Sequence, residues 1–83
     1  MKPAPDLRHA VELLENGDWN AAHEIVQRDE DSQLFCWAHG IVHLMEGDLS
    51  NARYWYRKAG RPPFGEAPAI AGEIRALKAE IGA

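Results

Sequence analysis

The sequence predicts an all-α protein of about five helices, folded as a single domain. Three observations predict it: apolar residues recur at helical spacing in five segments, turn residues separate these segments, and a Gly-Asp turn occurs twice. A chain of 83 residues is long enough for one domain and too short for two. Its hydrophobic share of 46% and charged share of 27% are those of a globular protein with a packed core.

The first helical hairpin is predicted at residues 6–29, after a loose N-terminal arm at residues 1–5 that contains two prolines. Asp6 can cap its first helix. The apolar residues of that helix share one face: Leu7, Ala10, Val11 and Leu14. Gly17 can adopt the left-handed conformation that ends a helix, and Asp18 can cap the next helix. The two helices are therefore expected to meet at a tight turn.

A second hairpin is predicted at residues 31–60, with Asp31 or Ser32 as the cap of its first helix. That helix, about residues 33–46, is the most apolar segment of the chain. It carries a stripe formed by Leu34, Ala38, Ile41 and Met45, flanked by Phe35, Trp37, Val42 and Leu44. The helix is therefore expected at the centre of the domain. Gly47-Asp48 then repeats the Gly-Asp turn of the first hairpin.

The C-terminal part is predicted as a stiff linker at residues 61–65 followed by a helix at residues 66–82. Pro68 would lie in the first turn of this helix, where proline is tolerated. The helix has one apolar stripe: Ile70, Ile74, Leu77 and Ile81. Two outcomes are open. This helix either covers the central helix within the chain, or leaves part of its apolar surface to a partner or a second copy.

The second hairpin resembles a tetratricopeptide repeat, in which small residues let paired antiparallel helices approach closely. The resemblance is carried by Gly40, Gly47, Ala52, Tyr56 and Ala59. Residues 6–29 are similar in keeping Ala10, Gly17 and Ala22, whereas Cys36, His39 and His43 differ from the family pattern. The resemblance implies helix pairs that offer a groove to a protein partner. Residues 46–60 also resemble a small family with no assigned activity, which implies no function.

Charge and composition argue against nucleic-acid partners, membrane insertion and secretion. The nine basic and 13 acidic residues give a net charge of −4, which weakens attraction to nucleic acids, so none is expected as a partner. No segment approaches the ~20 apolar residues of a membrane span, and no apolar stretch follows Lys2, so neither membrane insertion nor secretion is expected. A single cysteine, Cys36, fits a reducing compartment, and the protein is expected to be cytoplasmic.

His39 and His43 are the candidate metal ligands, because an i, i+4 pair places two imidazoles on one side of a helix. The same side carries Cys36 and Glu46, opposite the apolar stripe of the helix. Two histidines of the first hairpin could complete a site if packing brings them near: His9 and His23. The alternative is that the histidines serve polar packing or lie at the surface. A divalent metal is the one cofactor that the sequence suggests.

Basic and aromatic residues concentrate between Arg53 and Arg61. Arg53 and Arg57 are i, i+4 neighbours that can fork onto carboxylates or phosphate, and Tyr54 lies beside them. Trp55 and Tyr56 are expected to turn toward the core. The arginines either pair with acidic surface residues of the chain, or recognise an acidic peptide or a small anion.

Together these patterns predict a protein–protein interaction module that could associate with a second copy of itself. Its partner-binding residues would be Arg53, Tyr54 and Arg57, at the edge of the groove between the hairpins. The alternative function is metal or small-ligand binding through His39 and His43. An enzyme is the least favoured class, because 83 residues offer too few convergent polar groups. Cys36 beside His39 could be a nucleophile, but no device for stabilising an oxyanion accompanies it.

Overall fold

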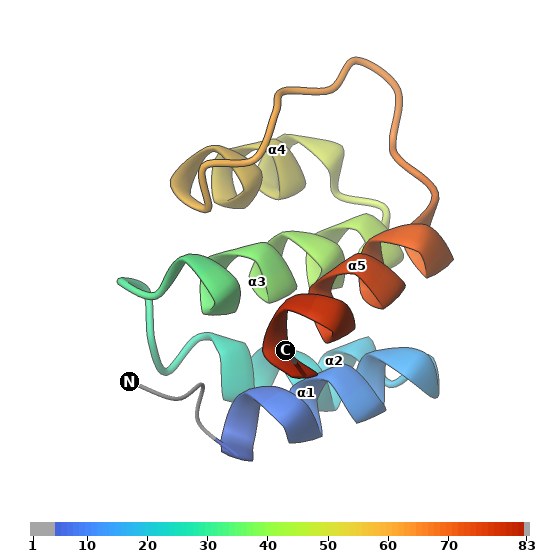
Figure 1. The fold of residues 1–83 in the computed structure, drawn as a ribbon. Coiled ribbons are helices and arrows are strands. Elements are labelled where there is room, and N and C mark those ends of the chain that lie inside the picture. The colour runs from blue at the N-terminus through green and yellow to red at the C-terminus, as the bar shows by residue number, and fades with distance from the viewer. Residues whose placement is uncertain (1–4, 83) are drawn as a thin grey trace.

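Five helices form the domain in a computed structural model that describes residues 5–82 (Figure 1). They are α1 (Pro5–Glu15), α2 (Trp19–Val26), α3 (Gln33–Glu46), α4 (Leu49–Lys58) and α5 (Ile70–Gly82). No strand occurs within this described range. The prediction of an all-α fold with about five helices is therefore confirmed. None of the helices in residues 5–82 has the length and apolar character needed to cross a membrane.

The two Gly-Asp turns have the same geometry, as the sequence predicts. Gly17 and Gly47 have φ angles of 80° and 89°, in the left-handed region that disfavours a Cβ. The backbone N–H of the residue that follows, Asp18 or Asp48, donates back to a carbonyl of the preceding helix at 2.8 and 2.9 Å. These bonds satisfy carbonyl groups that the helix end leaves free.

Side-chain caps begin the second helix of each hairpin. The carboxylate of Asp18 accepts a hydrogen bond from the backbone N–H of Ala21, and that of Asp48 accepts one from Asn51, each at 3.2 Å. The hydroxyl of Ser32 caps α3 in the same way. The predicted caps at both Gly-Asp turns are confirmed, and of the two candidates for α3 the structure selects Ser32.

The ends of two helices differ from the sequence prediction. Helix α1 begins at Pro5, so Asp6 lies in its first turn rather than capping it; the rest of the predicted N-terminal arm, residues 1–4, lies outside the described residues. Helix α5 begins at Ile70 and not at 66. Pro68 precedes the helix, because proline disfavours the helical conformation in the residue before it.

Helix α3 is the centre of the domain, as predicted, and packs against all four other helices. Every residue from Phe35 to Leu44 is buried, so the helix has no solvent-facing side along its middle turns. Its two polar buried residues are His39 and His43, which are 4% and 7% exposed. The helix side expected to be a solvated face or a second contact surface is thus a contact surface inside the chain.

A close approach between α3 and α4 depends on Gly40. A Cβ on this residue would overlap the ring of Tyr56 and would lie 3.4 Å from the backbone oxygen of Ala52. The absence of a side chain at Gly40 therefore lets the Tyr56 ring lie directly against the α3 backbone. Trp55 and Tyr56 are both buried, as predicted.

Helix α5 packs on the face that α1 and α3 form together, so that the two hairpins are covered from within the chain (Figure 1). Ile74, Leu77 and Ile81 are its buried residues. Between residues 5 and 82, Tyr54 is the one large hydrophobic side chain that is exposed. Of the two outcomes left open by the sequence, the structure therefore selects coverage by the C-terminal helix.

A partly buried carboxylate, that of Glu73, ties α5 to the second hairpin. Oε1 of Glu73 accepts hydrogen bonds from Nε1 of Trp37 at 3.2 Å and from the hydroxyl of Tyr56 at 2.6 Å. Burial, together with this contact, raises the pKa of Tyr56. The Arg61 guanidinium lies over the Trp37 ring, 3.9 Å from its centroid. The two hydrogen bonds to Glu73 give α5 a polar anchor in addition to its apolar face.

Replacement of Gly47 by alanine tests the Gly-Asp turn. No atom lies within 4 Å of a Cβ at this position, so the cost comes from backbone conformation alone. We expect Gly47→Ala to lower the free energy of unfolding by about 1 kcal/mol or more, measured by urea denaturation. Gly65→Ala is the matched control, because Gly65 also has free space and lacks a positive φ. Equal stability of the two variants would contradict the expectation.

Candidate functional site

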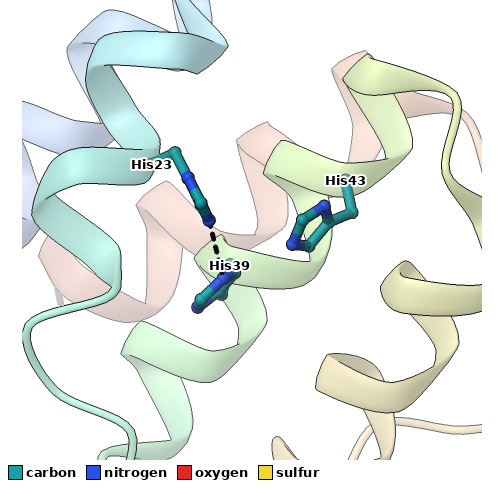
Figure 2. Close-up of side chains that lie close together, drawn as sticks. All are labelled: His23, His39 and His43. Atoms are coloured by element: carbon teal, nitrogen blue, oxygen red, sulfur yellow. Dashed lines mark hydrogen bonds between the residues drawn. The ribbon is translucent and has the colours of Figure 1, made fainter.

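Three histidines from two helices converge where the hairpins meet. His39 and His43 project from α3 toward α2, which contributes His23 (Figure 2). Nε2 of His23 and Nε2 of His39 are 3.2 Å apart. One nitrogen from each of the three rings can be chosen so that all three lie within 4.8 Å of one another. The structure thus brings together the two candidate ligands of the sequence and adds His23 as the third member of this three-histidine group.

Aromatic packing holds the ring of His39 in place. This ring stacks on Trp55 of α4, with centroids 3.8 Å apart and planes inclined by 9°. The ring of His43 is stacked with it at 5.1 Å. His23 meets both rings edge-on, at 4.9 and 5.3 Å. The three imidazoles are therefore positioned by packing between α2, α3 and α4 before any ligand binds.

Glu46 orients the ring of His43. Its Oε1 lies 2.8 Å from Nδ1 of His43, close enough for the ring N–H to donate to the carboxylate. With the proton held on Nδ1, Nε2 keeps a free lone pair. Figure 2 shows the ring of His43 pointing toward the other two histidines. A carboxylate behind a histidine in this way is the usual outer partner of a metal-ligating imidazole.

The electrostatic surroundings keep His39 neutral. Burial lowers the pKa of His39 from 6.5 to about 3, with smaller contributions from His23, His43 and Lys58. At neutral pH the ring of His39 therefore carries no charge. A neutral imidazole is the form that binds a metal ion or takes part in a histidine–histidine hydrogen bond.

The separation of the nitrogens suits a tetrahedral metal ion. Zinc binds histidine nitrogen at about 2.0–2.1 Å, which puts two nitrogens of a tetrahedral site roughly 3.3 Å apart. The 3.2 Å between His23 and His39 is close to this value. Three histidine ligands are also a known donor set of zinc sites that keep the fourth position open. The group could therefore hold a metal ion once the ring of His43, whose nitrogen lies within 4.8 Å of the other two, moves to the same separation.

The other ligand candidates of the sequence are placed elsewhere. Cys36 is buried and its Sγ donates to the backbone oxygen of Glu30 at 3.2 Å, while burial raises the pKa of the Cys36 thiol. His9 lies on α1 with its side chain 61% exposed, beside Glu12. Neither residue joins the three-histidine group. Glu46 belongs to the site as a partner of His43.

Of the three predicted partner-binding residues, two line the same cleft and the third does not. Arg53 and Arg57 line one cleft of about 220 Å³. Four further residues line it, including a third arginine: Tyr56, Arg61, Pro63 and Phe64. Tyr54 does not line this cleft and packs edge-on against Trp55, at 5.1 Å. Within residues 5–82, none of the three arginines pairs with a carboxylate. In the part of the chain that the structure describes, the arginines therefore form no ion pairs with acidic surface residues.

Comparison of the chain with protein-family models, with curated proteins and with solved structures finds no match. The tetratricopeptide resemblance stays a prediction.

The low pKa of His39 predicts how stability depends on pH. In the unfolded chain His39 takes up a proton near pH 6.5, whereas in the folded chain it stays unprotonated down to about pH 3. The free energy of unfolding should therefore be highest above pH 6.5 and fall as the pH is lowered through this window. We expect His39→Gln to show a shallower fall than the wild type in urea titrations with a chelator present. His9→Gln should keep the wild-type slope, and identical slopes in all three proteins would refute the assignment.

Proposed function

We propose that this protein binds a divalent transition-metal ion of the zinc class through His23, His39 and His43. The observation that carries the proposal is the convergence of their ring nitrogens, two of them 3.2 Å apart and all three within 4.8 Å. The 3.2 Å separation is also that of a histidine–histidine hydrogen bond, so polar packing is the competing explanation. Metal titration distinguishes the two.

The donor set selects the class of ion. Imidazole nitrogens suit zinc, copper and nickel, whereas magnesium and calcium prefer oxygen ligands. Three neutral ligands leave the ion with its full charge, which the carboxylate of Glu46 partly offsets through His43. The positive charge of Lys58 lies near His39 and weakens the binding of a metal cation there. The proposed site is therefore one of moderate affinity with an open coordination position.

A bound ion would also join the hairpins. His23 lies on α2, while His39 and His43 lie on α3, so coordination links the second helix of one hairpin to the first helix of the other. A ligand that binds the folded chain and not the unfolded one stabilises the fold by mass action. The expected consequence is a metal-dependent rise in the unfolding temperature.

A cytoplasmic location is part of the proposal. It is supported by Cys36, which is a free and buried thiol. A partner polypeptide in the groove of the hairpins has less support, because α5 covers the face of α1 and α3.

Titration of the metal-free protein with zinc tests the proposal. We expect one equivalent to bind in isothermal titration calorimetry and to raise the unfolding temperature of the wild type. His43→Gln and His23→Gln should lose both effects, because each removes one of three ligands. His9→Gln is the control and should behave as the wild type, since His9 is exposed and lies outside the group. Absence of binding by the wild type would leave polar packing as the role of the histidines.

Glu46→Gln tests the outer partner of the site. We expect this variant to bind zinc with the same stoichiometry and with affinity lowered about 10- to 100-fold, because the ring of His43 loses its carboxylate. Glu12→Gln is a matched control: Glu12 stands at i+3 from His9, as Glu46 does from His43, on an exposed helix surface. An unchanged affinity in Glu46→Gln would show that the carboxylate does not support the site.

A further inference from the structure

A second feature of the molecule, separate from the three-histidine group, is the cleft between α4 and the segment that leads to α5. Its six lining residues are Arg53, Tyr56, Arg57, Arg61, Pro63 and Phe64. Its volume of about 220 Å³ lies below the range of pockets that enclose drug-sized molecules, roughly 300–1,000 Å³. The cleft has room for an apolar side chain rather than for a large ligand.

The wall and floor of the cleft are apolar and held in place. The rings of Tyr56 and Phe64 pack edge-to-face, with centroids 5.3 Å apart. Arg53 ties the segment to α4, because its Nε donates to the backbone oxygen of Phe64 at 3.2 Å and its Nη2 to that of Gly65 at 2.8 Å. The guanidinium of Arg53 also lies 5.4 Å from the centroid of the Phe64 ring. The cleft is therefore built before it meets an occupant.

The residues that line the cleft include three arginines and no acidic residue, although Glu73 lies nearby with its carboxylate on the hydroxyl of Tyr56. Three guanidinium groups line it, and none of them makes an ion pair within the described residues. Arg57 is exposed, and Nε of Arg61 is a buried donor that has no hydrogen-bond partner. A carboxylate in the cleft would therefore meet guanidinium groups that are not already neutralised by an ion pair within the described residues. This local excess of positive charge occurs in a chain of net charge −4.

We propose that this cleft binds an acidic peptide segment of a partner protein, with one large apolar side chain between aspartate or glutamate residues. The apolar side chain would lie against Tyr56, Pro63 and Phe64, and the flanking carboxylates would pair with the exposed guanidinium of Arg57 and, through the charge of Arg61, be attracted to the same cleft. Nucleic acid fits less well, because it carries a charge at every phosphate and a chain of net charge −4 repels it more strongly than a peptide with a few carboxylates. The proposal does not depend on metal binding.

Fluorescence polarisation with a labelled peptide tests the cleft. The probe is acetyl-Glu-Asp-Leu-Asp-Glu-amide carrying a C-terminal fluorophore, titrated with wild-type protein in the presence of a chelator. We expect saturable binding with a Kd on the order of 0.1–1 mM. The peptide with lysine in place of its acidic residues, and the one with alanine in place of leucine, should each bind at least about 10-fold more weakly.

Charge reversal at the rim locates the binding. Arg57→Glu should weaken binding of the acidic probe about 10-fold or more and leave the circular dichroism spectrum unchanged, because within residues 5–82 the side chain of Arg57 makes no ion pair. Arg75→Glu is the matched control with the same change of net charge, since Arg75 is exposed on α5 and does not line the cleft. Phe64→Ala should also weaken binding by removing the apolar wall.

Three outcomes would overturn the proposal. They are absence of saturable binding of the acidic peptide by the wild type, equal binding by Arg57→Glu and Arg75→Glu, and preference for the lysine peptide or for a single-stranded oligonucleotide of the same charge as the probe. The zinc titrations use other residues, so their success or failure leaves this test unaffected.

Discussion

The enclosure of α3 by the other four helices is the constraint on which the rest of the structure depends. Water does not reach the middle turns of this helix, so each polar side chain there needs a hydrogen-bond partner inside the protein. His39 and His43 meet this need through His23 and Glu46. The three-histidine group is thus a direct consequence of placing two histidines on the central helix, and it also supplies the geometry of a metal site.

A second, partly buried group of polar contacts joins α5 to the same core. Glu73 accepts from Trp37 and Tyr56, and it gives the C-terminal helix a defined position on α1 and α3. Without such directional contacts, the apolar stripe of α5 could slide along the hairpins. The carboxylates of Glu46 and Glu73 therefore act alike, each fixing the orientation of a ring that packing alone would leave less defined.

Helix α4 links the two proposed sites. Adjacent residues on this helix face in different directions: Trp55 stacks on His39 of the three-histidine group, and Tyr56 lines the arginine cleft. Both rings are buried, and Gly40 on α3 permits the close approach of Tyr56. The position of α4 against α3 consequently sets the geometry of both sites, although their ligands are chemically unlike.

The sequence by itself determined the features that depend on neighbouring residues: five helical periods, the left-handed glycines with their aspartate caps, and the central place of the most apolar helix. Only the tertiary structure decided which distant residues meet. It brought His23 to the candidate ligands and kept His9 and Cys36 away, it laid α5 over the hairpins, and it turned Arg53 onto the linker. Local patterns report φ preferences and helix faces, whereas these contacts depend on the angles at which whole helices pack, and those are set by many side chains together.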